Sequence, residues 1–166
     1  MKRLIGAAIG AAIVVAVVAG IFVLPSAAQE PPPPIVSEPL TPRSVFPDDV
    51  TLKVKIKLDG GATKVVNVDD PSRTVTAKYT IQPGAQFPWH SHAGPVVVNV
   101  VQGALTYVDA DTCAEHTYSA GEAFVDPGQG HVHTAYNPTS GVTILVATFF
   151  AAPAQGSLLI PAQAAC

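Results

Sequence analysis

The chain has 166 residues, enough for one domain of ordinary size, and 48% of them are hydrophobic while only 13% are charged. The formal net charge is −3, and no lysine or arginine follows Lys78, whereas five acidic residues do. An acidic C-terminal half is a poor surface for a polyanion, so the composition argues against nucleic acid as a partner.

Residues 1–28 are typical of an export signal or a membrane anchor. Lys2 and Arg3 precede Leu4–Leu24, a run of 21 residues without a charge, and small residues follow up to Ala28. A basic start, an apolar centre and a small-residue end are the features of a signal peptide. As a helix of about 31 Å, the run is also long enough to span a bilayer uncleaved. In both cases the rest of the chain is expected outside the cytoplasm, either secreted or anchored to the membrane.

Residues 29–47 are rich in proline and begin with the run Pro31–Pro34. Such a run is stiff and extended. This segment is therefore predicted to be a spacer that separates the membrane from the folded domain.

From residue 50 onward, apolar and polar residues alternate with a period of two between turns rich in glycine and proline. The first alternating segment places three lysines on its polar face, which favours a solvated face that also protects an edge strand. No helical period runs long enough to predict a helix. Many short strands at this spacing predict an all-β sandwich or closed barrel over residues 48–151, followed by a tail at 152–166. The expected strands cover residues 50–58, 63–68, 73–82, 96–101, 104–108, 123–125, 131–136 and 142–150.

The chain contains two cysteines, Cys113 and Cys166. In an oxidising compartment an even pair is expected to be bridged. A disulfide between them would tie the C-terminal tail to the body of the domain.

Four of the five histidines form two His-x-His pairs, His90 with His92 and His131 with His133, within segments expected to be strands. Side chains at positions i and i+2 of a strand share a face, so each pair can present two imidazoles to one ion. Imidazole is a good ligand for Zn, Fe, Ni and Cu. The fifth histidine, His116, lies alone in a segment expected to be a polar surface loop.

The glycines, prolines and histidines of two segments, 84–103 and 121–137, occur at the spacing of a known family. The segments resemble the two motifs of the cupin superfamily in its single-domain form, with one extra residue between Pro127 and Gly130: Gly84-x5-His90-x-His92-x3-Val96-x6-Gly103 and Gly121-x5-Pro127-x2-Gly130-x2-His133-x3-Asn137.

The resemblance implies a small double-stranded β-helix, the jelly-roll or cupin barrel. It further implies a divalent metal ion (Fe, Zn, Mn, Ni or Cu) held by His90, His92 and His133, with His131 as the alternative third ligand. The usual fourth ligand of the family is a Glu at the position of Val96, and valine cannot bind a metal. Three neutral imidazoles would leave the ion its full +2 charge and open positions for water or substrate.

The N-terminal segment and the resemblance together predict an exported cupin-domain protein that binds a divalent metal through three histidines, with no activity or catalytic residues assigned. One alternative is a non-catalytic barrel, with or without metal, that binds a small ligand or another envelope component. The other is a dioxygenase-like oxidoreductase, because three-histidine sites occur among cupin thiol and diketone dioxygenases. The sequence leaves open a small-molecule ligand, a membrane contact through an uncleaved N-terminus, and a homodimer.

Overall fold

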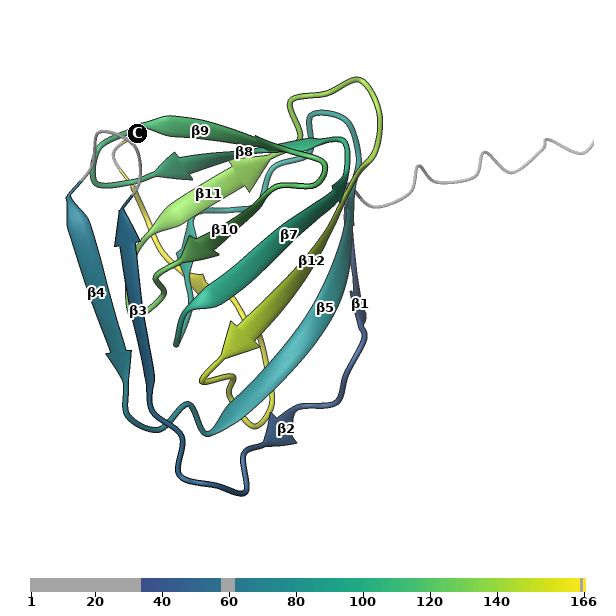
Figure 1. Ribbon diagram of the computed structural model, residues 1–166. Helices are drawn as coiled ribbons and strands as arrows, with labels where there is room; N and C mark the ends of the chain where they lie inside the picture. Colours follow the sequence, from purple (N-terminus) through teal and green to yellow (C-terminus); the bar gives the residue numbers. More distant parts are fainter. Residues whose placement is uncertain (1–33, 58–61, 165) are drawn as a thin grey trace, which may run out of the picture. The chain divides into compact units, whose positions relative to one another are not determined.

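The computed structural model describes residues 34–57, 62–164 and 166, so the expected signal or anchor at 1–28 and the first part of the spacer lie outside the described residues. Every regular element within the described residues is a β-strand (Figure 1). In this part of the chain, no helix is long and apolar enough to cross a membrane. The predicted all-β class is confirmed.

Two sheets form the domain, and a separate hairpin accompanies them. The larger sheet has the order β1-β5-β12-β7-β10, with β2 also paired to β5, and the smaller has the order β13-β6-β11-β8-β9. The strands of the larger sheet are β1 (Ile35–Pro39), β2 (Ser44–Val45), β5 (Arg73–Ile81), β7 (Val96–Gln102), β10 (Ala123–Asp126) and β12 (Thr143–Phe150). Those of the smaller are β6 (His90–Ser91), β8 (Ala104–Asp109), β9 (Glu115–Ser119), β11 (His133–Tyr136) and β13 (Ile160–Pro161), and the hairpin is β3 (Leu52–Lys57) with β4 (Thr63–Val68).

The core lies on the inner faces of the two sheets. Burial alternates along β5 and β12, as expected where one face of a strand packs inward and the other does not. The larger sheet contributes residues such as Tyr79, Val96 and Phe149, and the smaller contributes Leu105 and Tyr107 to the same apolar cluster. In Figure 1, β5, β12 and β7 run side by side and curve around this interior. This two-sheet arrangement is the sandwich or barrel that the strand spacing predicted, and it agrees with the jelly roll that the resemblance implied.

Both predicted boundaries of the barrel are corrected by the pairing. The segment expected to be a spacer up to residue 47 belongs to the domain from Ile35 onward, because β1 pairs with residues 77–81 of β5 and extends the sheet. Most side chains of β1 are exposed, so its sequence lacks the apolar alternation that identifies a half-buried strand. The tail also forms part of the domain, because Ile160 of β13 pairs with Ser91 of β6 in the smaller sheet.

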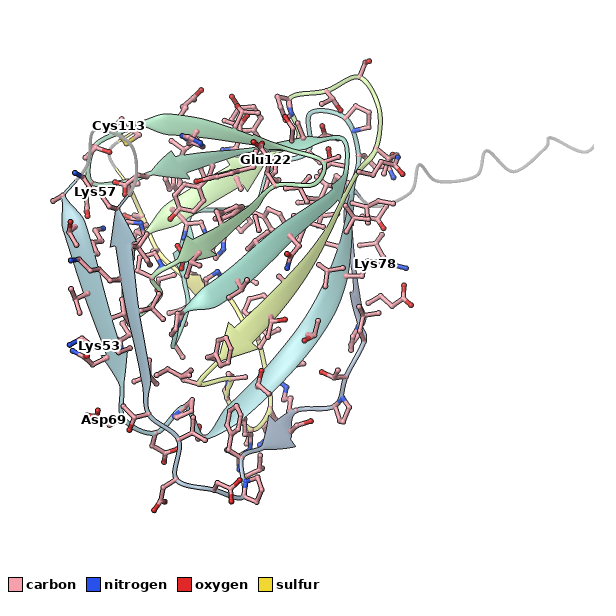
Figure 2. All side chains as sticks on the ribbon, viewed as in Figure 1. Lys53, Lys57, Asp69, Lys78, Cys113 and Glu122 are labelled. Atoms are coloured by element: carbon pink, nitrogen blue, oxygen red, sulfur yellow. A yellow bond between two sulfur atoms is a disulfide. The ribbon has the colours of Figure 1, made fainter. Side chains whose placement is uncertain are left out.

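The hairpin β3–β4 carries the row of lysines that was expected to be solvated. Lys53, Lys55 and Lys57 are all exposed and alternate with partly buried residues. Figure 2 shows Lys53 and Lys57 at the outer side of the hairpin. The prediction of a solvated face is confirmed.

The predicted loop around His116 is instead strand β9, which pairs with β8 and places His116 opposite Tyr107. His116 is nevertheless exposed, as expected. The turn between β8 and β9 contains Cys113, which is joined to Cys166 by a disulfide (Figure 2). The bridge ties the end of the tail to this turn, in agreement with the pairing expected from the cysteine count.

Candidate metal centre

Two short strands of the smaller sheet bring three histidines together. β6 contributes His90, and β11 begins at His133, which is its direct cross-strand partner. His92 lies two residues after His90, and all three side chains are buried, with residue exposures of 4–6%. The ring centroids are 4.8 Å apart for His90 and His92, 4.3 Å for His90 and His133, and 5.2 Å for His92 and His133. One ligand nitrogen from each ring lies within 4.8 Å of the other two.

Backbone carbonyls determine which nitrogen carries the proton in two of these rings. His90 Nδ1 lies 2.7 Å from the carbonyl oxygen of Pro88, and His92 Nδ1 lies 2.9 Å from that of Leu158. A carbonyl oxygen only accepts hydrogen bonds, so each neutral ring must carry its proton on Nδ1. The lone pair on Nε2 is then free to bind a metal.

The three rings are neutral at physiological pH. Burial lowers the pKa of His90 to about 4, and burial likewise lowers the pKa of His92 and, more strongly, that of His133. The proximity of the other histidines lowers the pKa of His133 further, because two neighbouring imidazolium ions repel. Metal ligation requires deprotonated nitrogen, so these rings could bind a cation without first losing a proton.

The two histidine-bearing segments meet through glycines. A Cβ atom on Gly128, whose φ is +61°, would lie 1.9 Å from the carbonyl oxygen of Gly94. Only glycine allows this approach, which joins the loop after His92 to the loop before His133. Gln129 and Gly130 also have positive φ values, of 51° and 85°. The backbone of residues 128–130 is therefore left-handed shortly before His133, which lies opposite His90.

The histidines border a small cavity of about 50 Å³ between the two sheets. Val96 and Val98 belong to its wall, and the rest is mostly apolar and aromatic. Neither lysine nor arginine occurs among the residues lining it. Its one carboxylate is Asp126, which is 1% exposed. Burial raises the pKa of this carboxyl group.

His131, the alternative ligand, does not join the three histidines. Its Nε2 lies 3.2 Å from Asp109 Oδ2, and its Nδ1 lies 2.7 Å from Lys64 Nζ. The Lys64 ammonium also lies 3.4 Å from Asp111 Oδ2. The structure therefore places the two residues of the second His-x-His pair in different clusters, with ring centroids 6.3 Å apart.

The three clustered histidines lie in a region whose sequence matches a known protein family. The family profile described as "Cupin domain" (Cupin_2) matches residues 77–149, the region that contains all three clustered histidines. Residues 77–149 belong to the cupin superfamily. A search of curated protein sequences found no match.

Several solved structures are similar to this cupin. They include the polyketide cyclase RemF from Streptomyces resistomycificus (19% identity, TM-score 0.43), KdgF from Halomonas sp. (19%, 0.47) and a RmlC-like cupin from Shewanella frigidimarina (29%, 0.41). The matches cover 47%, 74% and 48% of this chain and 54%, 84% and 67% of the respective structures. The similarity thus spans about half the length of RemF.

The donor set fits a divalent metal ion. Metal–nitrogen bonds of about 2.0–2.1 Å in a tetrahedral site place ligand nitrogens roughly 3.4 Å apart. Nitrogens that already lie within 4.8 Å of one another need only small ring movements to reach that spacing. Three neutral imidazoles and open positions on the cavity side are typical of a catalytic or ligand-binding metal site rather than a closed structural one.

Other contributors to the cupin site were not predicted from the sequence. The carbonyl of Leu158, which accepts a hydrogen bond from His92, comes from the C-terminal tail. Asp126 lines the cavity, and its position there depends on the register of β10 against β7. Asn137, the last residue of the second motif, donates through its side-chain amide to the carbonyls of Ile81 and Gly141.

Proposed function

We propose that this cupin is an exported protein that binds one divalent metal ion through His90, His92 and His133. The observation that carries the proposal is the convergence of three buried, neutral imidazoles on one cavity. Two of the three have their tautomers set by backbone carbonyls. Buried polar rings with free lone pairs cost free energy unless a partner satisfies them, and a cation at their centre does so.

When bound, the metal would act as a Lewis acid toward a ligand in its open positions. The histidines would hold it, and the valine and phenylalanine side chains of the wall would exclude bulk water. Val96 adds no charge, so a three-histidine ion keeps a positive field directed at the cavity.

The lining favours a small, uncharged ligand. An anionic ligand usually needs an arginine or lysine partner, and the cavity contains neither among its lining residues. A volume of about 50 Å³ leaves room for only a few non-hydrogen atoms beside a metal. A dioxygenase-like oxidoreductase acting on a small chelating substrate is compatible with this space. A non-catalytic barrel that holds the metal or an apolar molecule is favoured by the apolar and aromatic side chains that make up most of the wall.

Export belongs to the same proposal. The apolar run Leu4–Leu24 lies outside the described residues, so its role as a cleaved signal or a retained anchor rests on its sequence. The Cys113–Cys166 disulfide supports an oxidising compartment, where such bridges persist.

The test is the metal content of the full-length chain after purification and reconstitution in turn with Fe, Zn, Mn, Ni and Cu. We expect one equivalent per chain with at least one of these metals, and loss of that equivalent in His90→Ala. Less than a tenth of an equivalent with every metal would refute the metal-binding proposal. Oxygen consumption with a panel of thiols and diketones then distinguishes the oxidoreductase from the non-catalytic barrel.

A further inference from the structure

Asp126 lies beside the position at which a metal-binding carboxylate is missing. In the pairing of β10 with β7, Asp126 is the direct cross-strand partner of Val96. Directly opposed residues of an antiparallel pair point to the same face, with Cβ atoms about 4.5–5.5 Å apart. Both side chains line the cavity, so a carboxylate enters the site from the strand adjacent to Val96.

Two donors hold this carboxylate in place. The Tyr107 hydroxyl donates to Asp126 Oδ2 over 2.7 Å, and the Gly128 N–H donates to Oδ1 over 2.8 Å. Both oxygens therefore act as acceptors. The Tyr107 ring also stacks on the His133 ring, with an interplanar angle of 18° and centroids 4.8 Å apart. Asp126, Tyr107 and His133 thus form one packed unit.

The held carboxylate faces the third histidine. Asp126 Oδ2 lies 3.1 Å from His133 Nδ1. That nitrogen is buried and makes no aligned hydrogen bond. A small rotation of the ring, of the size needed to draw three ligand nitrogens together around an ion, would align its N–H with the carboxylate.

We infer that Asp126 is a positioning residue that holds His133 in its Nδ1–H tautomer and supplies, through that ring, the negative charge that Val96 lacks. The inference rests on the proposed metal site and extends it. The Nδ1 atoms of His90 and His92 donate to neutral carbonyls, whereas the Nδ1 atom of His133 faces a carboxylate oxygen. A carboxylate behind a ligating imidazole fixes its orientation and makes its free nitrogen a stronger donor.

The experiment compares Asp126→Asn with wild type in two measurements. In the metal-free protein, long-range ¹⁵N–¹H NMR spectra of the imidazoles report the His133 tautomer. We expect Nδ1–H in wild type and a mixture or the Nε2–H form in the variant. In a chelator competition with Zn²⁺, we expect the affinity of the variant to fall about 10–100-fold. An unchanged tautomer together with an affinity within twofold of wild type would overturn the inference.

Asp109→Asn is the matched control, because Asp109 is also a buried carboxylate beside a histidine, His131, but does not line the cavity. It should leave the zinc affinity and the His133 tautomer unchanged. An equal loss of affinity in this control would show a general effect of removing buried charge and would overturn the inference.

Tyr107→Phe keeps the inference testable if Asp126→Asn does not fold. It removes one hydrogen bond to Asp126 and retains the carboxylate, so we expect roughly a 2–10-fold loss of zinc affinity. An unchanged affinity in a folded Tyr107→Phe would then count against the inference. If wild type binds no metal, the proposed function fails, whereas the metal-free NMR measurement still decides whether Asp126 holds His133.

Discussion

Two histidine clusters lie side by side in this cupin, and they differ in what occupies their centres. The first consists of His90, His92 and His133 and has only neutral nitrogens around an apolar cavity. The second consists of His131, Asp109 and Asp111, whose ligand atoms also lie within 4.8 Å of one another. In the second cluster the ammonium of Lys64 contacts all three partners, at 2.7, 3.9 and 3.4 Å.

The comparison shows that ligand spacing alone does not make a metal site. The second cluster carries two carboxylates and would attract a cation more strongly by charge, yet the protein supplies that cation itself from β4. The first cluster has no lysine or arginine among the residues lining its cavity. Among these lining residues, no side-chain cation therefore competes for the three histidine nitrogens. The sequence pattern His-x-His occurs in both pairs, yet both residues of the first pair lie in the first cluster, whereas the second pair is divided between the two clusters.

Removal of single histidines should separate the clusters most strongly. His90→Ala, His92→Ala and His133→Ala should each weaken zinc binding by more than about 100-fold, because the loss of a direct ligand exceeds the effect of an outer partner. His131→Ala should stay within about threefold of wild type. Chelator competition measures all four variants. A large loss in His131→Ala with retention in His133→Ala would reverse the assignment.

Removal of the disulfide should have the next largest effect, on the free energy of unfolding. The bridge joins the tail, whose Leu158 carbonyl contacts His92 of the first cluster, to the β8–β9 turn, which contains Asp111 of the second. Cys113 and Cys166 are separated by 53 residues, so the double Ser variant should lose about 4 kcal/mol of unfolding free energy on the chain-entropy model. Urea unfolding of the full chain measures it, with reduced wild type as the control. A loss below about 1 kcal/mol would show that the tail is held by its strand pairing alone.

Acid should destabilise the metal-free protein through the first cluster. The pKa of each of its histidines is lower in the folded protein than in the unfolded chain, so the unfolded chain takes up protons first. Stability should be full above the unfolded value of 6.5 and fall as the pH drops toward 4. The slope should be about 1.4 kcal/mol per pH unit for each histidine.

Asp126 acts in the opposite direction, because burial raises its pKa and its protonation stabilises the folded state as the pH falls. Because three histidines oppose this one carboxyl group, the unfolding free energy should still fall as the pH drops. Urea midpoints in chelator at several pH values test the slope, and His133→Ala should flatten it. A midpoint that does not change between pH 7 and 4 would contradict the neutral state of the rings.

Lys64→Met should have the smallest effect. The Lys64 side chain is 41% exposed, and ion pairs of this kind contribute at most about 1 kcal/mol. We expect a loss of that size in unfolding free energy and no change in the zinc affinity of the first cluster. A drop in zinc affinity would show that the two clusters are coupled through His131 and His133.

Much of this fold follows from local pattern. Apolar alternation marks β5, and apolar runs mark β7 and β12, while glycine and proline mark the turns between such segments. The convergence of His90 and His133 also follows from the two motifs. The exposed strand β1 and the polar strand β9 were missed because neither buries an alternating face.

The parts of the site that were missed depend on tertiary position. The Leu158 carbonyl fixes the tautomer of His92, but every residue has a carbonyl, so no side chain signals this role. Asp126 could have been found only from the register of β10 against β7, which places it opposite Val96. The position of Lys64 likewise depends on how a separate hairpin meets the β8–β9 turn.

X-ray absorption at the zinc K-edge of the zinc-loaded full-length protein tests the central claim most directly. The account predicts three imidazole nitrogens at about 2.0–2.1 Å, completed by water oxygen, with no sulfur. His90→Ala should remove this signature, and His131→Ala should preserve it. A first shell dominated by carboxylate oxygen, or one with fewer than two imidazoles, would contradict the account.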